Sequence, residues 1–178
     1  MNLDKLSIGK NPPDIINVVV EIPQGGPPVK YEVDKDSGAL VVDRFMSTAM
    51  FYPANYGFIP HTLSGDGDPC DVLVVSHVPV LAGSVIACRP IGVLLMKDES
   101  GEDEKIIAVP TEKLSPFMAH IQSCNDLQPI LVQQIEHFFA HYKDLEKGKW
   151  VEIIRWGDAA EAKKLINEGI ARAQSKAA

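Results

Sequence analysis

Hydrophobic positions in the first 110 residues follow the pattern of short β-strands. Apolar and β-branched residues gather in runs that Gly, Pro and Asp separate, at 15–22, 29–34, 40–45, 71–76, 85–88, 91–97 and 105–109. Two pairs of runs flank short turn sequences, DKDSG at 34–38 and ESGE at 99–102, and both pairs predict hairpins. Several short strands at this spacing predict a small barrel or sandwich.

The apolar period changes in the last third of the chain. Hydrophobic residues between 130 and 142 recur at helical spacing, which predicts a long amphipathic helix. Asn125 or Asp126 is the candidate cap, and Pro129 falls in the first turn, where proline is tolerated because its missing N–H needs no partner.

A further strand and a final helix complete the pattern. Residues 150–156 predict the strand, and Asp158 with Glu161 resembles a capping pair that opens a helix through Ile170. The chain is therefore predicted to be β first and then mostly α.

Composition supports one folded domain. The chain has 178 residues, of which 46% are hydrophobic and 23% are charged, and we find no repeat or linker. Without an apolar run of membrane-spanning length or a secretory signal, we expect a cytoplasmic protein with no membrane partner. Cys70, Cys88 and Cys124 are too far apart for a C-x-x-C motif, so we expect reduced, mostly buried thiols.

The net charge of −7 lies in two short segments. Residues 66–71 (DGDPCD) carry −3 and residues 98–105 (DESGEDEK) carry −4, while the rest of the chain is formally neutral. The acidic surplus opposes binding to nucleic acid, which needs clustered cations. Like charges packed this closely need solvent or a cation to neutralise them.

The first acidic segment has the composition of a cation-binding loop. Asp66, Asp68 and Asp71 surround Gly and Pro just before a strand, so the backbone can turn all three carboxylates toward one point. An EF-hand loop is excluded, because an EF-hand needs Gly at its sixth position and an acid at its twelfth, and this segment has neither. The alternative is a solvated acidic turn. The second segment is equally compatible with a soluble hairpin tip, but two acidic patches can converge to hold two or more divalent ions.

Basic residues accompany these acids. Lys30 and Glu32 share one face of a strand, and Arg44 lies on the partner strand of the hairpin. Taken singly, these and other cations and tyrosines are ordinary surface or half-buried residues. Together with the acids they indicate a site for a phosphorylated substrate bridged by Mg²⁺.

Two other features carry less chemistry. His137 and His141 lie one helical turn apart and can bind a metal or line an interface, but with no third ligand evident we expect exposed or interfacial histidines. The segment 51–62 (FYPANYGFIPHT) predicts a rigid, core-forming loop.

An ordered set of motifs resembles the soluble family I inorganic pyrophosphatases in their short bacterial form. The motifs are EIP at 21–23, KYE at 30–32, DR at 43–44, YPANYGFIPHTLSGDGDPCDVLV at 52–74, KDE at 97–99, EDEK at 102–105 and HYKDLE at 141–146, and they cover nearly the whole chain. The resemblance implies one α+β domain over 1–178, a distorted five-stranded antiparallel OB-like β-barrel with flanking, mainly C-terminal helices. It also implies Mg²⁺-dependent hydrolysis of inorganic pyrophosphate to two orthophosphates by an inorganic diphosphatase.

The resemblance also implies roles for particular residues. Asp68 matches the general base beside the attacking water. The residues that match metal ligands are Asp66, Asp71, Asp98, Asp103, Glu21 and Glu32, the two glutamates acting partly through water. The residues that match phosphate-binding donors are Lys30, Arg44, Tyr56, Lys105, Tyr142 and Lys143. Family members of this length imply a homohexamer built from two trimers, with the helix bearing His137 and His141 as a contact surface.

Cys70 departs from the aliphatic residue usual at its position in the family. It lies between two acids of the first segment, so we predict that its oxidation lowers activity and that Cys70→Val removes this sensitivity. Two other functions compete with the enzyme: a non-enzymatic OB-type module for single-stranded nucleic acid, which would need aromatic platforms along a basic groove, and a calcium-stabilised structural domain, which would not need the cations.

Overall fold

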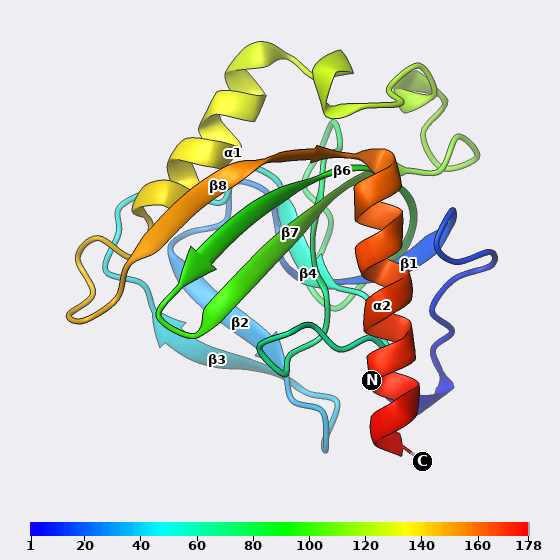
Figure 1. Ribbon diagram of the computed structural model, residues 1–178, viewed down its shortest axis with the longest axis horizontal. Coiled ribbons are helices and arrows are strands. Elements are labelled where there is room, and N and C mark those ends of the chain that lie inside the picture. Colours follow the sequence, from blue (N-terminus) through cyan, green and yellow to red (C-terminus); the bar gives the residue numbers. More distant parts are fainter. Residues whose placement is uncertain (178) are drawn as a thin grey trace.

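The computed structural model describes residues 1–177, which form a strand-rich body with two α-helices (Figure 1). Ala178, the last residue of the predicted domain, lies outside the described residues. The strands are β1 (Ile16–Ile22), β2 (Val29–Val33), β3 (Leu40–Phe45), β4 (Asn55–Phe58), β5 (Asp71–Val74), β6 (Val85–Asp98), β7 (Gly101–Pro110) and β8 (Val151–Asp158). The helices are α1 (Pro129–His141) and α2 (Ala159–Ala177).

Five strands close into a barrel. The sheet order is β1-β4-β5-β7-β6-β8, and an additional pairing of β1 with β6 closes the first five of these into a ring. The predicted α+β, OB-like barrel is therefore confirmed. One detail differs, because β5 and β7 run parallel while the other pairs of the ring are antiparallel, so the sheet is mixed.

Both faces of the barrel strands are buried, and this explains their nearly continuous apolar sequences. Leu73 and Ile107 pack into one core, whereas their neighbours Val72 and Ile106 pack into a second core on the opposite face of the strands. Side chains alternate across a strand, so each residue of such a run faces one core or the other.

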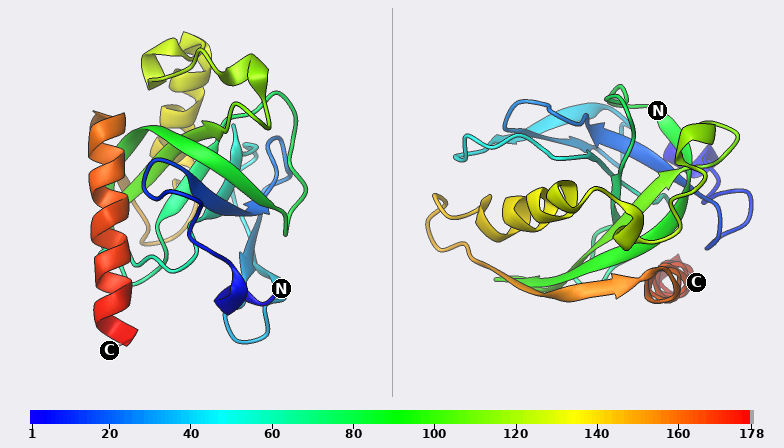
Figure 2. Two further views of the ribbon diagram at one scale, coloured as in Figure 1. Left: turned by 90° about the vertical axis from the view of Figure 1, so that its right-hand side faces the viewer. Right: turned by 90° about the horizontal axis from the view of Figure 1, so that it is seen from above.

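Each helix covers one of these cores. Phe138 and Phe139 of α1 join the first core, with Leu73 and Ile107, and α1 lies between β8 and the β2–β3 hairpin (Figure 2). Ala162 and Ile166 of α2 join the second core, with Val72 and Ile106, and α2 runs along the outside of the barrel. Apolar residues spaced three or four apart are what give each helix one buried face. No helix within residues 1–177 is long and apolar enough to span a membrane.

The sequence pattern misses one strand and divides another. The segment 51–62, predicted as a loop, contains β4, whose four residues are all buried. Proline and aromatic residues hide it, and Gly57 is needed because a Cβ there would meet the carbonyl oxygen of Val19 on β1 at 1.9 Å. The runs at 85–88 and 91–97 form one strand, β6, because a bulge between Pro90 and Gly92 accommodates the proline without ending the strand.

Helix caps are partly as predicted. Asp158 accepts a hydrogen bond from the Glu161 amide at the start of α2 (2.8 Å), but the Glu161 carboxylate pairs with Arg155 instead of completing a capping box. Asp126 belongs to a capping box with Ser123 in a short 3-10 helix at 124–126, and α1 begins later, at Pro129.

Candidate active site

The β6–β7 hairpin places a lysine between two aspartates. The Lys105 Nζ atom lies 2.6 Å from Asp71 Oδ2 on β5 and 2.6 Å from Asp103 Oδ1, two residues earlier on the same face of β7. Asp71 is the register partner of Lys105 across the parallel β5–β7 pair. Burial alone would lower the pKa of Lys105, but the two carboxylates outweigh it and raise that pKa well above its usual range. Lys105 therefore stays charged.

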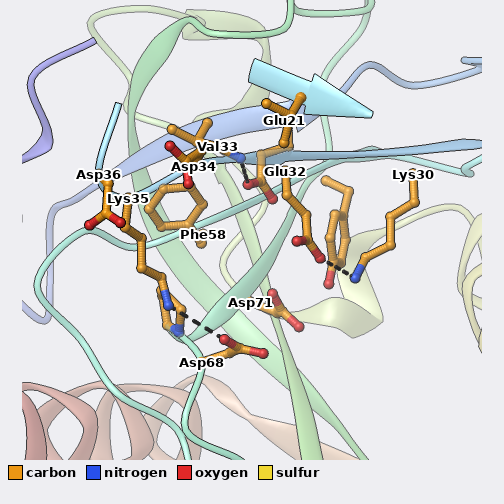
Figure 3. Close-up of a pocket in the computed structure, with 13 residues that line it drawn as sticks. Glu21, Lys30, Glu32, Val33, Asp34, Lys35, Asp36, Phe58, Asp68 and Asp71 are labelled. Carbon is orange, nitrogen blue, oxygen red and sulfur yellow. Dashed lines mark hydrogen bonds and ion pairs between the residues drawn. The ribbon is translucent and has the colours of Figure 1, made fainter. Parts of the chain in front are cut away.

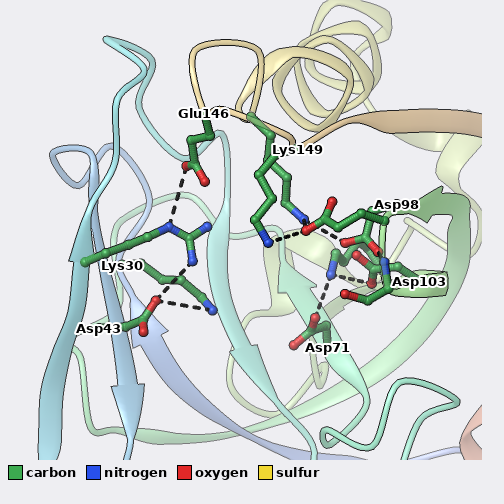
Figure 4. A network of polar contacts seen from close by, with 12 residues as sticks. Lys30, Asp43, Asp71, Asp98, Asp103, Glu146 and Lys149 are labelled. Carbon is green, nitrogen blue, oxygen red and sulfur yellow. Dashed lines mark hydrogen bonds and ion pairs between the residues drawn. The ribbon is translucent and has the colours of Figure 1, made fainter.

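A second lysine reaches the same hairpin from the end of α1. The Lys143 Nζ atom lies 2.6 Å from Asp98 Oδ2, and both side chains are about nine-tenths buried. Burial opposes ionisation of Asp98, yet the hydrogen bond from Lys143 leaves its pKa below the usual range. Lys149, in the turn before β8, pairs with Glu99 and extends this network (Figure 4).

The β2–β3 hairpin supplies two further cations. Lys30 and Arg44 are register partners, and Asp43 lies 3.7 Å from Lys30 Nζ and 3.1 Å from Arg44 Nη1 (Figure 4). Lys30 also pairs with Glu32. The Arg44 Nε atom lies 3.5 Å from Glu146 Oε1. The Lys30 ammonium thus lies on the opposite side of the cavity from Asp98 and Asp103, which pair with Lys143 and Lys105 (Figure 4).

Glu21 enters the site because of a bulge in β1. The β1–β4 register shifts between Val20 and Ile22, which leaves Glu21 as the extra residue and turns its carboxylate toward β2, where it accepts a hydrogen bond from the Val33 amide at 2.7 Å. Burial is the main cause that raises the pKa of Glu21 to about 8, and nearby Asp71 and Glu32 add to it. Figure 3 shows Glu21, Glu32 and Asp71 around one cavity.

Asp66 and Asp68 lie on the exposed loop between β4 and β5. The Asp66 Oδ1 atom accepts a hydrogen bond from the Asp68 amide at 3.0 Å. Burial, followed by the charges of Asp103 and Asp71, raises the pKa of Asp66. The Asp68 side chain is 75% exposed, and its ion pair is with Lys35 of the β2–β3 turn, at 3.4 Å (Figure 3).

Aromatic rings line the floor of the site. The Lys105 ammonium lies 5.8 Å from the ring centroids of both Tyr56 and Phe139, and Lys143 lies 5.5 Å from that of Tyr142. Burial raises the pKa of both Tyr56 and Tyr142, so their phenols stay protonated and can donate hydrogen bonds.

All of the predicted site residues line one or both of two adjoining cavities. The cavity of about 450 Å³ takes Glu21 and Glu32, and the cavity of about 230 Å³ takes most of the others. Four residues line both cavities and join them: Lys30, Tyr56, Asp68 and Asp71. The remaining predicted residues, which line the smaller cavity alone, are Arg44, Asp66, Asp98, Asp103, Lys105, Tyr142 and Lys143.

The cavities also contain residues that we did not predict. Tyr52, Glu99 and Lys149 line the smaller cavity, and Lys35 lines the larger one. Tyr52 and Glu99 fall within the motifs that suggested the family, so the sequence could have identified them as site residues. Lys149 lies in a Gly- and Lys-rich turn whose composition gives no sign of a site.

Two sequence features lie apart from the cavities. His137 and His141 form a ring pair with centroids 4.7 Å apart on α1, and neither lines the two cavities.

The oxidation hypothesis for Cys70 does not fit the structure. Its side chain is 1% exposed in the second core, and burial raises the pKa of its thiol. A protonated, covered thiol is a poor target for peroxide.

The carboxylates of the site offer oxygen ligands, which a hard divalent cation prefers. Mg²⁺ prefers carboxylate oxygens. Burial, and after it the charges of neighbouring carboxylates, raises the pKa values of Glu21 and Asp66, and a bound cation offsets both effects. Within residues 1–177, no three acidic, histidine or cysteine side chains are already grouped as a complete ligand set. Instead, Lys105 lies between Asp71 and Asp103.

The closed barrel and its cavity define an OB-like protein with a polar, charge-rich ligand site. Residues 18–174 match the family model of inorganic pyrophosphatase. The inorganic pyrophosphatase of Rickettsia felis is 62% identical over 97% of this chain and 99% of its own length, and that of Bradyrhizobium diazoefficiens is 58% identical over 99% of both. The structure of an inorganic pyrophosphatase from Coxiella burnetii superposes with a TM-score of 0.91 at 49% identity, covering 94% of this chain and 99% of that one. The chain belongs to the inorganic pyrophosphatase family.

Proposed function

We propose that this chain is an inorganic diphosphatase that hydrolyses inorganic pyrophosphate to two orthophosphates, with Mg²⁺ as its cofactor. The observation that carries the proposal is the cavity in which Lys105 lies between Asp71 and Asp103, with further cations and acids around it, in a member of this family. Pyrophosphate has no apolar part, so its binding must be almost wholly electrostatic. A charge-rich cavity of about 230 Å³ suits a ligand of that kind.

Metal ions are assigned to the carboxylates. The residues that would hold Mg²⁺ are Glu21, Glu32, Asp66, Asp71, Asp98 and Asp103. When bound, Mg²⁺ neutralises phosphate charge and draws the pKa of its water toward neutrality. Asp71 is central to this assignment because it lines both cavities.

Phosphate oxygens are assigned to the cations and phenols. Lys30 and Arg44 approach the cavity from the β2–β3 hairpin, and Lys105 and Lys143 approach from the other side. Donors on opposite sides can hold the two phosphates of the substrate and stabilise the charge that develops on the leaving one. Tyr56 and Tyr142 complete the donor set.

Asp68 is assigned as the general base. Its carboxylate is 75% exposed and has one exposed cationic neighbour, Lys35, so its oxygens are accessible to a water. A carboxylate suffices as base once the pKa of the attacking water is lowered. Asp68 takes the proton from that water as the water attacks phosphorus in line with the departing phosphate.

The direct test is phosphate release from pyrophosphate. We expect release with Mg²⁺ and its loss with excess chelator. No release with any divalent ion would contradict the enzyme assignment and would leave a structural or binding role for the acids.

We also propose a single-domain, cytoplasmic homohexamer built from two trimers, with the exposed face of α1 as one contact surface. Support comes from that face, where Ile130 is 61% exposed and the His141 Nδ1 atom lies 2.8 Å from Asp144 Oδ2. Sedimentation analysis should give six times the 19.4 kDa chain mass, and a monomer would contradict the proposal.

A further inference from the structure

The loop that carries Asp66 and Asp68 lies beside α2 (Figure 1), and two hydrogen bonds join its base to that helix. The Leu63 amide donates to the Gly169 carbonyl at 3.0 Å, and Arg172 Nε donates to the Leu63 carbonyl at 2.7 Å. Residues three apart lie on the same face of a helix. One face of α2 therefore satisfies both backbone groups of Leu63.

Gly169 explains how the helix comes so close. A glycine inside a helix costs about 1 kcal/mol relative to alanine, so its presence needs a reason. A Cβ at this position would lie 2.5 Å from Cys70 Sγ and 3.4 Å from the Leu63 carbonyl oxygen. Leu63 and Cys70 are the two ends of the stretch 63–70, which carries Asp66 and Asp68. The absence of a side chain at 169 thus allows α2 to contact both ends.

Ser64 connects this base to β7. Its hydroxyl donates to Glu104 Oε1 at 3.0 Å, and both side chains are buried. Glu104 lies between Asp103 and Lys105, and alternation along the strand turns it away from the cavity that they line. The loop is therefore held from behind by the face of β7 opposite the cavity.

Ser64 also fixes the acidic turn in front of it. Its amide donates to the Asp68 carbonyl at 2.7 Å, and the Gly67 amide donates to the Ser64 carbonyl at 3.2 Å. The tip of the loop is exposed, and its ion pair between Asp68 and Lys35 is worth little in water. The position of the two acids is therefore set at the base of the loop.

We infer that α2 is a positioning element for divalent-cation binding, in which Gly169 and Arg172 hold Leu63 and Ser64 so that Asp66 and Asp68 face the cavity. Neither α2 residue lines the two cavities. The inference rests on the proposed function, which assigns the acids of this loop to the metal and to the base. Groups that orient metal ligands are typically worth 10–100-fold in metal affinity.

Binding of Mn²⁺ alone to the full-length protein tests this directly. Electron paramagnetic resonance of free Mn²⁺, without pyrophosphate, measures the dissociation constant. Gly169→Ala and Arg172→Met should each weaken binding about tenfold. In phosphate-release assays, the half-saturating Mg²⁺ concentration should rise in parallel.

Matched controls on α2 separate positioning from helix effects. Asn167→Ala adds alanine at an exposed position of the helix, and Lys164→Met removes an exposed cation. Both should bind Mn²⁺ as the parent does. A weakening of equal size in these controls would overturn the inference, because the effect would then belong to the helix in general.

A double variant provides a rescue. Cys70→Ala removes the Sγ atom that a Cβ at 169 would meet, so Cys70→Ala with Gly169→Ala should restore Mn²⁺ affinity toward the parent value. Cys70→Ala alone should leave the affinity unchanged. Absence of rescue would contradict the packing argument, and parental affinity in both Gly169→Ala and Arg172→Met would contradict the whole inference.

Folding and function are checked separately. Far-UV circular dichroism and thermal unfolding establish that each variant folds. If Arg172→Met does not fold, the Mn²⁺ affinities of Gly169→Ala and of its double variant with Cys70→Ala test the inference. If the parent fails to hydrolyse pyrophosphate but the variants still weaken Mn²⁺ binding, the proposed function fails and the positioning role is supported.

Discussion

The two acidic segments are both rich in carboxylates but differ in environment. In 98–105, Asp98 and Asp103 are each about nine-tenths buried, and each lies 2.6 Å from a lysine Nζ atom. In 66–71, Asp68 is mostly exposed, and its ion pair is with the exposed Lys35. The hairpin is thus neutralised within the folded chain, whereas much of the loop charge is left for solvent or a ligand.

This difference shows what folding adds to a charge count. Lys143 is 45 residues from Asp98 along the chain, and Lys105 pairs with Asp71 across 34 residues. These partners come from the turn after α1 and from a parallel strand pair, so no local sequence pattern predicts the ion pairs. The hairpin acts as a prearranged part of the site, and the loop acts as the part that must be held in place.

The largest effect is expected on the loop. Asp68→Asn should lower the rate of pyrophosphate hydrolysis about 100-fold or more, because an amide cannot take a proton from water. Mn²⁺ affinity should change little, since Asp68 is assigned as base and not as ligand. Initial rates of phosphate release at saturating Mg²⁺ measure this, and a parental rate would remove Asp68 as the base.

On the hairpin, Lys105→Met should act on stability as well as on activity. Removing the ammonium leaves two partly buried carboxylates facing each other, so the free energy of unfolding should fall by about 3 kcal/mol at pH 7. The deficit should shrink when Asp103→Asn is added to Lys105→Met, because one of the two facing carboxylates then carries no charge. Urea unfolding of the single and the double variant at pH 7 measures it; equal deficits would argue against charge repulsion as the cause.

The exposed ion pair between Lys35 and Asp68 provides the matched comparison for Lys105→Met. Lys35→Met should alter the free energy of unfolding by less than about 1 kcal/mol, because exposed ion pairs contribute little. The same urea measurement applies. A loss as large as that from Lys105→Met would erase the distinction between the two segments.

The smallest effect is expected at the thiols. Burial raises the pKa of Cys124 to about 12 and also raises that of Cys70, so neither is reactive near neutral pH. Reaction of the native protein with Ellman's reagent at pH 8 should be much slower than that of the urea-unfolded protein. Fast labelling of Cys70 in the native state, together with loss of activity, would revive the oxidation hypothesis.

Much of the fold could be predicted from periodicity, and the exceptions have physical causes. Strand β4 escaped because its short buried run contains aromatic residues and a glycine required by close contact with β1. Strand β6 was divided because Pro90 suggested an end where a bulge allows the strand to continue. In both places long-range pairing overrides local turn signals.

The candidate site could be predicted in its members but not in its connections. The motifs named every acid and donor assigned to it, and all of them line the two cavities. The bonds from Gly169 and Arg172 to Leu63 could not be foreseen, because a helix interior glycine and a surface arginine have no distinctive pattern. They depend on how α2 packs, which only the folded chain determines.

The central claim is that the chain hydrolyses pyrophosphate in this acidic cavity and needs a divalent cation to do so. The most direct measurement is release of orthophosphate from pyrophosphate by the purified chain, with Mg²⁺ and then with excess chelator. We predict rapid release with Mg²⁺, its loss with chelator and its recovery when Mg²⁺ is restored. Release that continues in chelator, or no release with any divalent ion, would contradict the account.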